Sequence, residues 1–163
     1  AHILGLNSVA ERYADIAKKM AMKWEEMANE GDHYRLAFDR NNTWSQKYNI
    51  IWDKMWNLNI FPNNVISKEI NYYLTKQNLY GLPLDSRRDY TKSDWIMWTA
   101  AMSPNREIFE KFVDPLYKYI NETTSRVPIS DWHDTKTGRM TGFKARSVIG
   151  GYWIQVLMDK MNH

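Results

Sequence analysis

The chain has 163 residues, 44% of them hydrophobic, with eight Trp and ten Tyr, which excludes a disordered protein and fits one domain with its own core. The absence of Cys excludes disulfides, thiolate metal sites and a cysteine nucleophile. The net charge of +3 is spread along the chain without a Lys/Arg cluster, and no apolar run reaches the length of a membrane span. We therefore expect neither a nucleic-acid partner nor a membrane partner.

The spacing of the apolar residues predicts six helices with almost no strand. These helices are expected over residues 6–27, 43–56, 63–74, 95–102, 105–120 and 144–161. Thr43 is expected to cap the second helix. Pro115 is expected to kink or split the fifth. Gly150 and Gly151 fall inside the sixth helix, where they would let a neighbouring element approach closely.

Two of the predicted helices are apolar on nearly every side, over residues 50–56 and 95–102. A helix that is buried all round belongs to the inner layer of a two-layer helical assembly. Alternating inner and outer helices predict an all-α fold of the α/α toroid type, with three αα-hairpins forming about half of a six-hairpin ring. We expect residues 1–163 to form a single helical domain within a larger toroid.

Three polar, aromatic stretches between these helices are candidates for function, at residues 43–49, 82–95 and 128–151. The third is longer than a connector requires, and it contains two carboxylates, an imidazole and an indole within residues 131–134. We expect the three stretches to meet at one end of the helical scaffold and to line a cleft.

Seven phrases along the chain resemble the C-terminal region of the microbial glutaminase A family. They are Gly31-Asp-His-Tyr-Arg-Leu-Ala-Phe-Asp39, Thr43-Trp-Ser-Gln-Lys-Tyr-Asn49, Trp52-Asp-Lys54, Tyr80-Gly-Leu-Pro-Leu-Asp-Ser-Arg87, Asp89-Tyr-Thr-Lys-Ser-Asp-Trp95, Val127-Pro-Ile-Ser-Asp-Trp132 and Ala145-Arg-Ser-Val-Ile-Gly-Gly151. The resemblance implies a six-hairpin toroid, hydrolysis of the amide of glutamine without a cofactor, and a secreted or periplasmic protein. It does not by itself identify a catalytic residue.

Hydrolysis of a carboxamide needs a nucleophile, oxyanion stabilisation and a proton for the departing ammonia. Without Cys, the nucleophile would be a Ser, a Thr or a water activated by a carboxylate. Asp94 and Asp131 each stand in a Ser-Asp-Trp tripeptide, where contact with an indole would raise the carboxyl pKa and favour a catalytic acid or base. The alternative for Asp94 is a first-turn carboxylate that stabilises its helix. Asp131, His133 and Asp134 lack a metal-ligand spacing, so no metal is predicted.

An amino-acid substrate also needs its charged ends to be bound. Arg87 or Arg146 is a candidate for the α-carboxylate, with a structural ion pair as the alternative. Asp85 with the face of Trp44 is a candidate for the α-ammonium. Trp132, like Trp44, is either a substrate platform or an aromatic that packs at the rim of the site.

Two other classes of function are also compatible with the sequence. A glycoside-acting enzyme on the same scaffold would use the paired carboxylates to flank a sugar. A non-catalytic module would use the loops to bind a partner. A half ring would expose an apolar edge, so we expect this edge to contact the rest of its own toroid or another copy of the chain, and the chain alone to be catalytically silent.

Overall fold

The computed structural model describes residues 1–161; the last two residues of the predicted domain, 162 and 163, lie outside it. The α-helices are α1 (Asn7–Ala28), α2 (Ile51–Met55), α3 (Asn63–Leu74), α4 (Ser93–Ala101), α5 (Arg106–Glu122) and α6 (Ile154–Met161). The strands are β1 (Tyr90–Lys92), β2 (Trp132–Asp134) and β3 (Met140–Gly142). Three 3₁₀ helices are η1 (His2–Leu4), η2 (Tyr48–Ile50) and η3 (Ser147–Trp153). No helix in this part of the chain is both long enough and apolar enough to cross a membrane.

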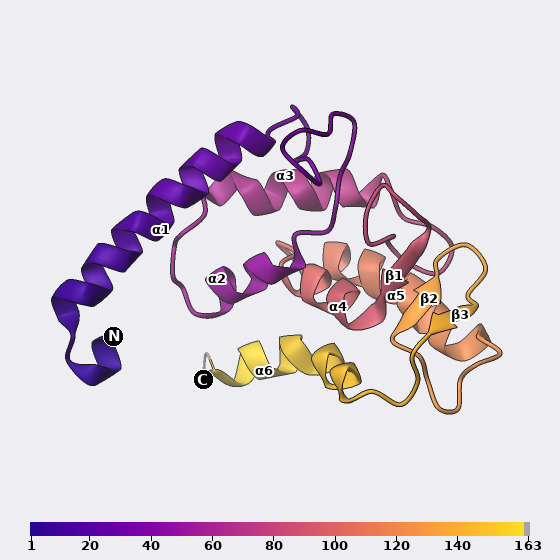
Figure 1. Cartoon of the computed structure of the whole chain (residues 1–163). Coiled ribbons are helices and arrows are strands. Elements are labelled where there is room, and N and C mark those ends of the chain that lie inside the picture. Colours follow the sequence, from indigo (N-terminus) through magenta and orange to yellow (C-terminus); the bar gives the residue numbers. More distant parts are fainter. Residues whose placement is uncertain (162–163) are drawn as a thin grey trace.

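The helices are arranged in successive antiparallel pairs (Figure 1). Helices α1, α3 and α5 run toward the end that carries the small sheet, and α2, α4 and α6 run back from it. The connections at the sheet end are long, whereas α2 and α3 are joined only by residues 56–62, and α4 and α5 only by residues 102–105. This asymmetry places the irregular polar segments together at one end of the scaffold, as is common for functional loops.

Helix α4 is the centre of the core. It packs against α2, α5, α6 and η3, and most of its residues are buried, which confirms the prediction of an all-round apolar helix near residues 95–102. The buried core side chains include Ile51, Val65, Ile70, Tyr73, Ile96, Ala100, Phe112, Leu116, Tyr119 and Ile154. Burial of this kind contributes about 1.5–3 kcal/mol per large apolar side chain, and it holds α4 in a fixed position beneath the loops.

The small sheet corrects the prediction of a purely all-α fold. Strand β2 pairs antiparallel with β1 and β3, and Thr91 lies opposite His133. Trp132 lies opposite Gly142, where a Cβ atom would come within 3.0 Å of the indole ring. Each strand has only three residues, so its alternation is too short to produce a recognisable period in the sequence.

Two of the predicted helices are shorter than expected. In the segment 43–56, α-helix begins only at Ile51, because the backbone of Ser45 and Gln46 bonds to the segment around Leu84 instead. Thr43 is not a helix cap; its hydroxyl donates to the carbonyl of Arg40 at 2.6 Å.

The predicted helix 144–161 is also divided. Phe143 and Ala145 adopt positive φ values of 50° and 52°, so the chain turns before it enters η3 and then α6. The close approach expected at the glycine pair occurs at Gly151, where a Cβ atom would lie 2.9 Å from Nε1 of Trp98, but not at Gly150. Helix α5 continues through Pro115 without being split.

The first and last helices expose apolar side chains. Helix α1 contacts the rest of the molecule near its C-terminal end, where Asn64 donates to Glu25 and the Trp24 and Phe61 rings lie 5.5 Å apart. The exposed apolar residues at the two ends of the chain are Ile3, Leu4, Leu6, Val9, Tyr13, Ile16, Met20, Met22 and Met27, and Trp153, Val156, Leu157 and Met161. An apolar edge of this kind was expected of a partial ring.

Candidate functional site

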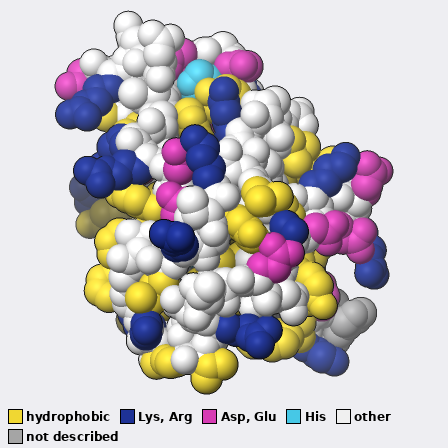
Figure 2. Space-filling view, turned by 90° about the vertical axis from the view of Figure 1, so that its right-hand side faces the viewer, with side chains coloured by type: hydrophobic (Ala, Val, Ile, Leu, Met, Phe, Trp, Pro, Cys, Tyr) yellow, Lys and Arg dark blue, Asp and Glu magenta, His cyan; other side chains and the backbone are white. Residues whose placement is uncertain are grey.

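Three connecting segments meet at the sheet end, as the sequence predicted. We call them loop A (residues 29–47), loop B (residues 75–92) and loop C (residues 123–146). Loops A and B are joined by backbone hydrogen bonds, including Ser86 N to the carbonyl of Trp44 at 3.0 Å. Loops B and C are joined by the β1–β2 pairing. Figure 2 views this end of the molecule and shows basic, acidic and apolar side chains interspersed across it, without a continuous basic patch.

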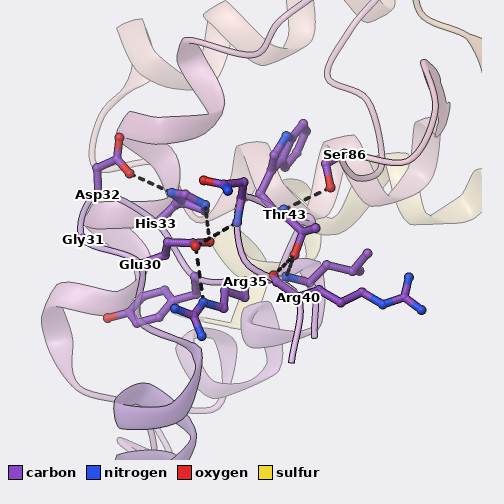
Figure 3. Close-up of polar contacts among 12 residues, drawn as sticks. Glu30, Gly31, Asp32, His33, Arg35, Arg40, Thr43 and Ser86 are labelled. Atoms are coloured by element: carbon purple, nitrogen blue, oxygen red, sulfur yellow. Dashed lines mark hydrogen bonds and ion pairs between the residues drawn. The ribbon is translucent and has the colours of Figure 1, made fainter. Parts of the chain in front are cut away.

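Loop A is held by a polar cluster around Glu30 (Figure 3). This carboxylate accepts a hydrogen bond from the backbone of Asn42 at 2.8 Å and lies 3.4 Å from His33 Nε2 and 3.5 Å from Arg35 Nε. The backbone bond is the main reason why the pKa of Glu30 is lowered. Asp32 contacts the other ring nitrogen of His33 at 2.7 Å. These contacts fix the path of loop A.

The side chain of Gln46 ties the loops to the core. Its amide nitrogen donates to the carbonyls of Leu82 and Pro83 at 3.2 and 2.9 Å, and its amide oxygen accepts from the hydroxyl of Thr99 on α4 at 3.0 Å. Because the side chain is buried and both ends of its amide are bonded, loops A and B have a fixed position relative to α4.

A first group of predicted residues forms a buried charge cluster between β1, β2 and loop C. Asp131 is only 1% exposed, with Lys92 Nζ 3.1 Å from Oδ2 and Arg146 Nε 3.5 Å from Oδ1. Lys92 Nζ also lies 4.6 Å from the ring centroid of Trp132 and 4.5 Å from that of Phe143. A cation in contact with a carboxylate and two aromatic faces is strongly localised.

Asp94 lies next to this cluster, in the first turn of α4. It is buried, and its Oδ1 atom has no hydrogen-bond partner among the described residues. Burial, followed by the negative charge of Asp131, raises the pKa of the Asp94 carboxyl to about 6. The two carboxylates therefore have different environments, because Asp131 is paired with cations and Asp94 is not. Such a difference separates acid and base roles in many active sites.

A second group of predicted residues lies apart from these carboxylates, where loops A and B meet. Arg87 donates to both carboxylate oxygens of Asp85, at 2.9 and 2.7 Å, so these two candidates for the substrate's charged ends bind each other. The side chain of Trp44 lies in the core against Tyr72 and Tyr73, which makes it a packing residue and not an exposed platform. Of the seven predicted site residues, Asp94, Asp131, Trp132 and Arg146 are brought together, and Trp44, Asp85 and Arg87 form the second group.

A cavity of about 360 Å³ opens between loops A and B beside this second group. Its size suits a small-molecule ligand. Its polar lining residues are Ser45, Gln46, Lys47, Asn49, Asp85 and Arg87, and its aromatic lining residues are Trp24, Tyr48, Phe61 and Trp95. Tyr48 and Trp95 stack at 4.1 Å to form one wall. None of the residues that line this cavity belongs to loop C, and neither Asp94 nor Asp131 is among them. The prediction that all three polar stretches line one cleft is therefore met only for loops A and B.

Two lysines that were not among the predicted site residues, Lys47 and Lys92, make several contacts with the loops of the candidate site. Lys47 Nζ lies 3.0 Å from the carbonyl of Tyr34, 3.1 Å from Oγ of Ser45 and 3.7 Å from Oε2 of Glu69. Burial lowers the pKa of Lys47 and raises that of Glu69. One signal was present in the sequence, since Glu69 interrupts the apolar face of α3 that includes Val65, Ile70 and Tyr73.

His133 has a structural environment. Its side chain is buried, stacks on Tyr119 at 3.6 Å, and contacts the carbonyl of Tyr80 through Nε2 at 2.8 Å. Burial lowers its pKa to about 4, so the ring is neutral near pH 7. Within residues 1–161, no group of three or more His, Asp or Glu side chains is arranged to hold a metal ion.

Paired helices with long polar loops gathered at one end define a helical-hairpin domain with a candidate site at its loop end. The chain belongs to the family described as the glutaminase A six helical-hairpin domain, whose model matches residues 1–156. It is 32% identical to glutaminase A of Aspergillus oryzae over 156 residues, which is 91% of this chain and 22% of the relative. It is 26% identical over 202 aligned residues to a probable glutaminase of Arthroderma benhamiae, covering 97% of this chain and 23% of the relative.

These matches confirm the resemblance seen in the sequence. The chain spans less than a quarter of the length of either relative. No solved structure matches it significantly.

Proposed function

We propose that this chain is part of an amidohydrolase that converts L-glutamine and water to glutamate and ammonia. The observation that carries the proposal is the extent of the family match, because residues 1–156 include loops A, B and C as well as the helices beneath them. A helical scaffold alone can host many chemistries, whereas similarity that continues through the loops includes the residues of the site.

In this proposal Asp94 and Asp131 are the acid–base groups on the α4 side of the site. Asp131 lies against the cations of Lys92 and Arg146, whereas burial favours the protonated form of Asp94. A carboxyl with a pKa of about 6 can both donate and accept a proton near neutral pH. The indole of Trp132 lies against the ammonium of Lys92 and shields it.

We also propose that the three helix pairs are part of a larger α/α toroid and that the site is completed by polypeptide outside this chain. The apolar faces of α1 and α6 support this, since a closed ring would cover both. The purified chain is expected to self-associate through these faces and to release no ammonia from glutamine. Light scattering that finds a monodisperse monomer, or steady turnover by the chain alone, would contradict these two expectations.

The direct test is ammonia release from glutamine by the complete protein that contains this chain, compared with its Asp94→Asn and Asp131→Asn variants. We expect the wild type to release ammonia and each variant to lose at least 100-fold in kcat/KM, about the effect of removing a general acid or base. A Glu107→Gln variant, on the exposed side of α5, is the control and should keep full activity. A folded wild type that releases no ammonia would overturn the proposal.

A further inference from the structure

The cavity between loops A and B is lined by a serine hydroxyl in contact with a buried lysine amine. This pair offers a nucleophile and a base, which the carboxylates Asp94 and Asp131 do not. Ser45 and Lys47 are two residues apart on the irregular part of loop A, and both line the cavity. Lys47 Nζ lies 3.1 Å from Oγ of Ser45. Ser45 is only partly buried, whereas the side chain of Lys47 is only 12% exposed.

We propose that Ser45 is the nucleophile of the amide hydrolysis and that Lys47 is its general base. This inference rests on the proposed function and deepens it. It assigns the attacking group, which that function left open, and it moves the proton transfers at that group from Asp94 and Asp131 to Lys47. A serine hydroxyl is a weak nucleophile until a neighbouring base takes its proton, and lysine serves as that base in some serine amidases and proteases.

The surroundings of Lys47 suit this role. Its Nζ atom has two backbone acceptors, the carbonyl of Tyr34 at 3.0 Å and that of Ser45 at 2.9 Å. When the amine is neutral, its two N–H groups are satisfied by these carbonyls and its lone pair is free to face Oγ of Ser45. Burial lowers the lysine pKa and makes this neutral form more accessible than in an exposed lysine.

The charged groups around Lys47 oppose the effect of burial on its pKa. Glu69 on α3 lies 3.7 Å from Nζ and is itself bonded by the hydroxyl of Tyr73 and by the backbone N–H of Tyr34. Asp85 of loop B also favours the charged lysine, although its carboxylate is already paired with Arg87. The burial of the amine outweighs both of these contributions, because the net direction of the Lys47 pKa is downward.

The proposed reaction balances with these two residues. Oγ of Ser45 bonds to the side-chain carbonyl carbon of glutamine as its proton passes to Nζ of Lys47. The lysine ammonium then gives that proton to the departing nitrogen, the C–N bond breaks, and ammonia leaves a glutamyl ester on Ser45. Water attacks the ester carbon, one water proton passes through Lys47 to Oγ of Ser45, and glutamate is released.

The test uses an alkyl fluorophosphonate, which reacts with activated serine hydroxyls, on the 163-residue chain and on the complete protein. We expect one adduct by intact mass, mapped by peptide analysis to Ser45 and absent from the Ser45→Ala variant. Lys47→Met and Lys47→Arg should slow labelling by roughly 100-fold, since neither side chain can take the proton. Ser67→Ala on α3 and Lys19→Met on α1 are the matched controls and should label like the wild type.

Loss of the fold is a separate outcome that the variants must exclude. Lys47→Met leaves Glu69 buried without its cation, so the double variant Lys47→Met/Glu69→Gln removes both charges and is compared by circular dichroism and thermal unfolding. In the wild type the labelling rate should rise with pH, because the neutral amine is required, and it should reach half its maximum below 10.5, the ordinary pKa of a lysine. A rate independent of pH between 6 and 10 contradicts the role of Lys47.

The outcomes separate this inference from the proposed function. Ammonia release that survives Ser45→Ala in the complete protein overturns the inference and leaves the function standing. If Ser45 is labelled but the complete protein does not act on glutamine, the assignment of Ser45 as the nucleophile is supported and the assignment of glutamine as the substrate is overturned. Labelling that persists in Ser45→Ala but disappears in Asp94→Asn or Asp131→Asn assigns the attack to the carboxylate side and overturns the inference.

Discussion

Replacing Asp94 by Asn should stabilise the protein at neutral pH. In the folded state the carboxyl pKa rises from 3.8 to about 6. A change of this size corresponds to about 3 kcal/mol of penalty on the charged form. Solvent screening and relaxation near the loops reduce it, so we expect Asp94→Asn to gain about 1–2 kcal/mol above pH 7.

The sign of this effect depends on pH. Between pH 3.8 and about 6 the folded state binds a proton that the unfolded state does not, so this group's contribution to stability falls as the pH rises. The advantage of the Asn variant should therefore be complete above about pH 7 and disappear below pH 4. Urea unfolding of both proteins at pH 4, 5.5 and 7.5 measures this difference.

A second carboxylate provides the matched control. The pKa of Asp134 is lowered, with its carboxylate accepting hydrogen bonds from the backbone and side chain of Thr137. The Asp134→Asn variant should therefore lose stability at neutral pH, the opposite sign to Asp94→Asn. If Asp94→Asn proves destabilising at pH 7.5, or if its effect is the same at every pH, the reasoning about its buried charge is refuted.

Three further predictions concern the packing and charges of the loop end. Gly151→Ala should cost about 1–3 kcal/mol in unfolding free energy, because its Cβ would lie 2.9 Å from an indole nitrogen, whereas Gly150→Ala, which faces open space, should change it by less than about 0.5 kcal/mol. The wild type should lose unfolding free energy as the pH falls from 6.5 to about 4, because over this range His133 is protonated in the unfolded state but stays neutral when it is buried in the folded state. The His133→Gln variant should not show this loss when unfolding is measured over the same pH range. Asp131→Asn should lower the unfolding free energy by about 3 kcal/mol, and by less when Lys92 is already replaced by Met. If the two substitutions have additive effects in this double-mutant cycle, Asp131 and Lys92 are not coupled.

The central helix and the meeting of the loops could be predicted from the sequence because both follow from local patterns. A run of nine residues with almost no charge, residues 93–101, is buried wherever it is helical. Long polar connections that alternate with short ones must gather at one end when the helices are antiparallel. The phrases that resemble the glutaminase A family also predicted the family to which the domain belongs.

The roles of individual side chains were harder to predict because they depend on contacts between distant segments. The pairing of Lys47 with Glu69 joins loop A to α3, and the local sequence around either residue gives no indication of this contact. Trp44 was a candidate platform because an indole in a polar loop is equally compatible with the core and with the rim of a site. The sheet was missed because three-residue strands acquire their structure only through pairing.

The bonds of Gln46 have a consequence for the energetics of ligand binding. This one amide bonds loop B at one end and α4 at the other, so the walls of the cavity are already ordered before a ligand arrives. A site built on loose loops must lose conformational entropy at the moment of binding, at about 0.5–1.5 kcal/mol for each side chain that becomes fixed. Here that loss occurs during folding, so more of the contact energy with a small ligand remains available as affinity.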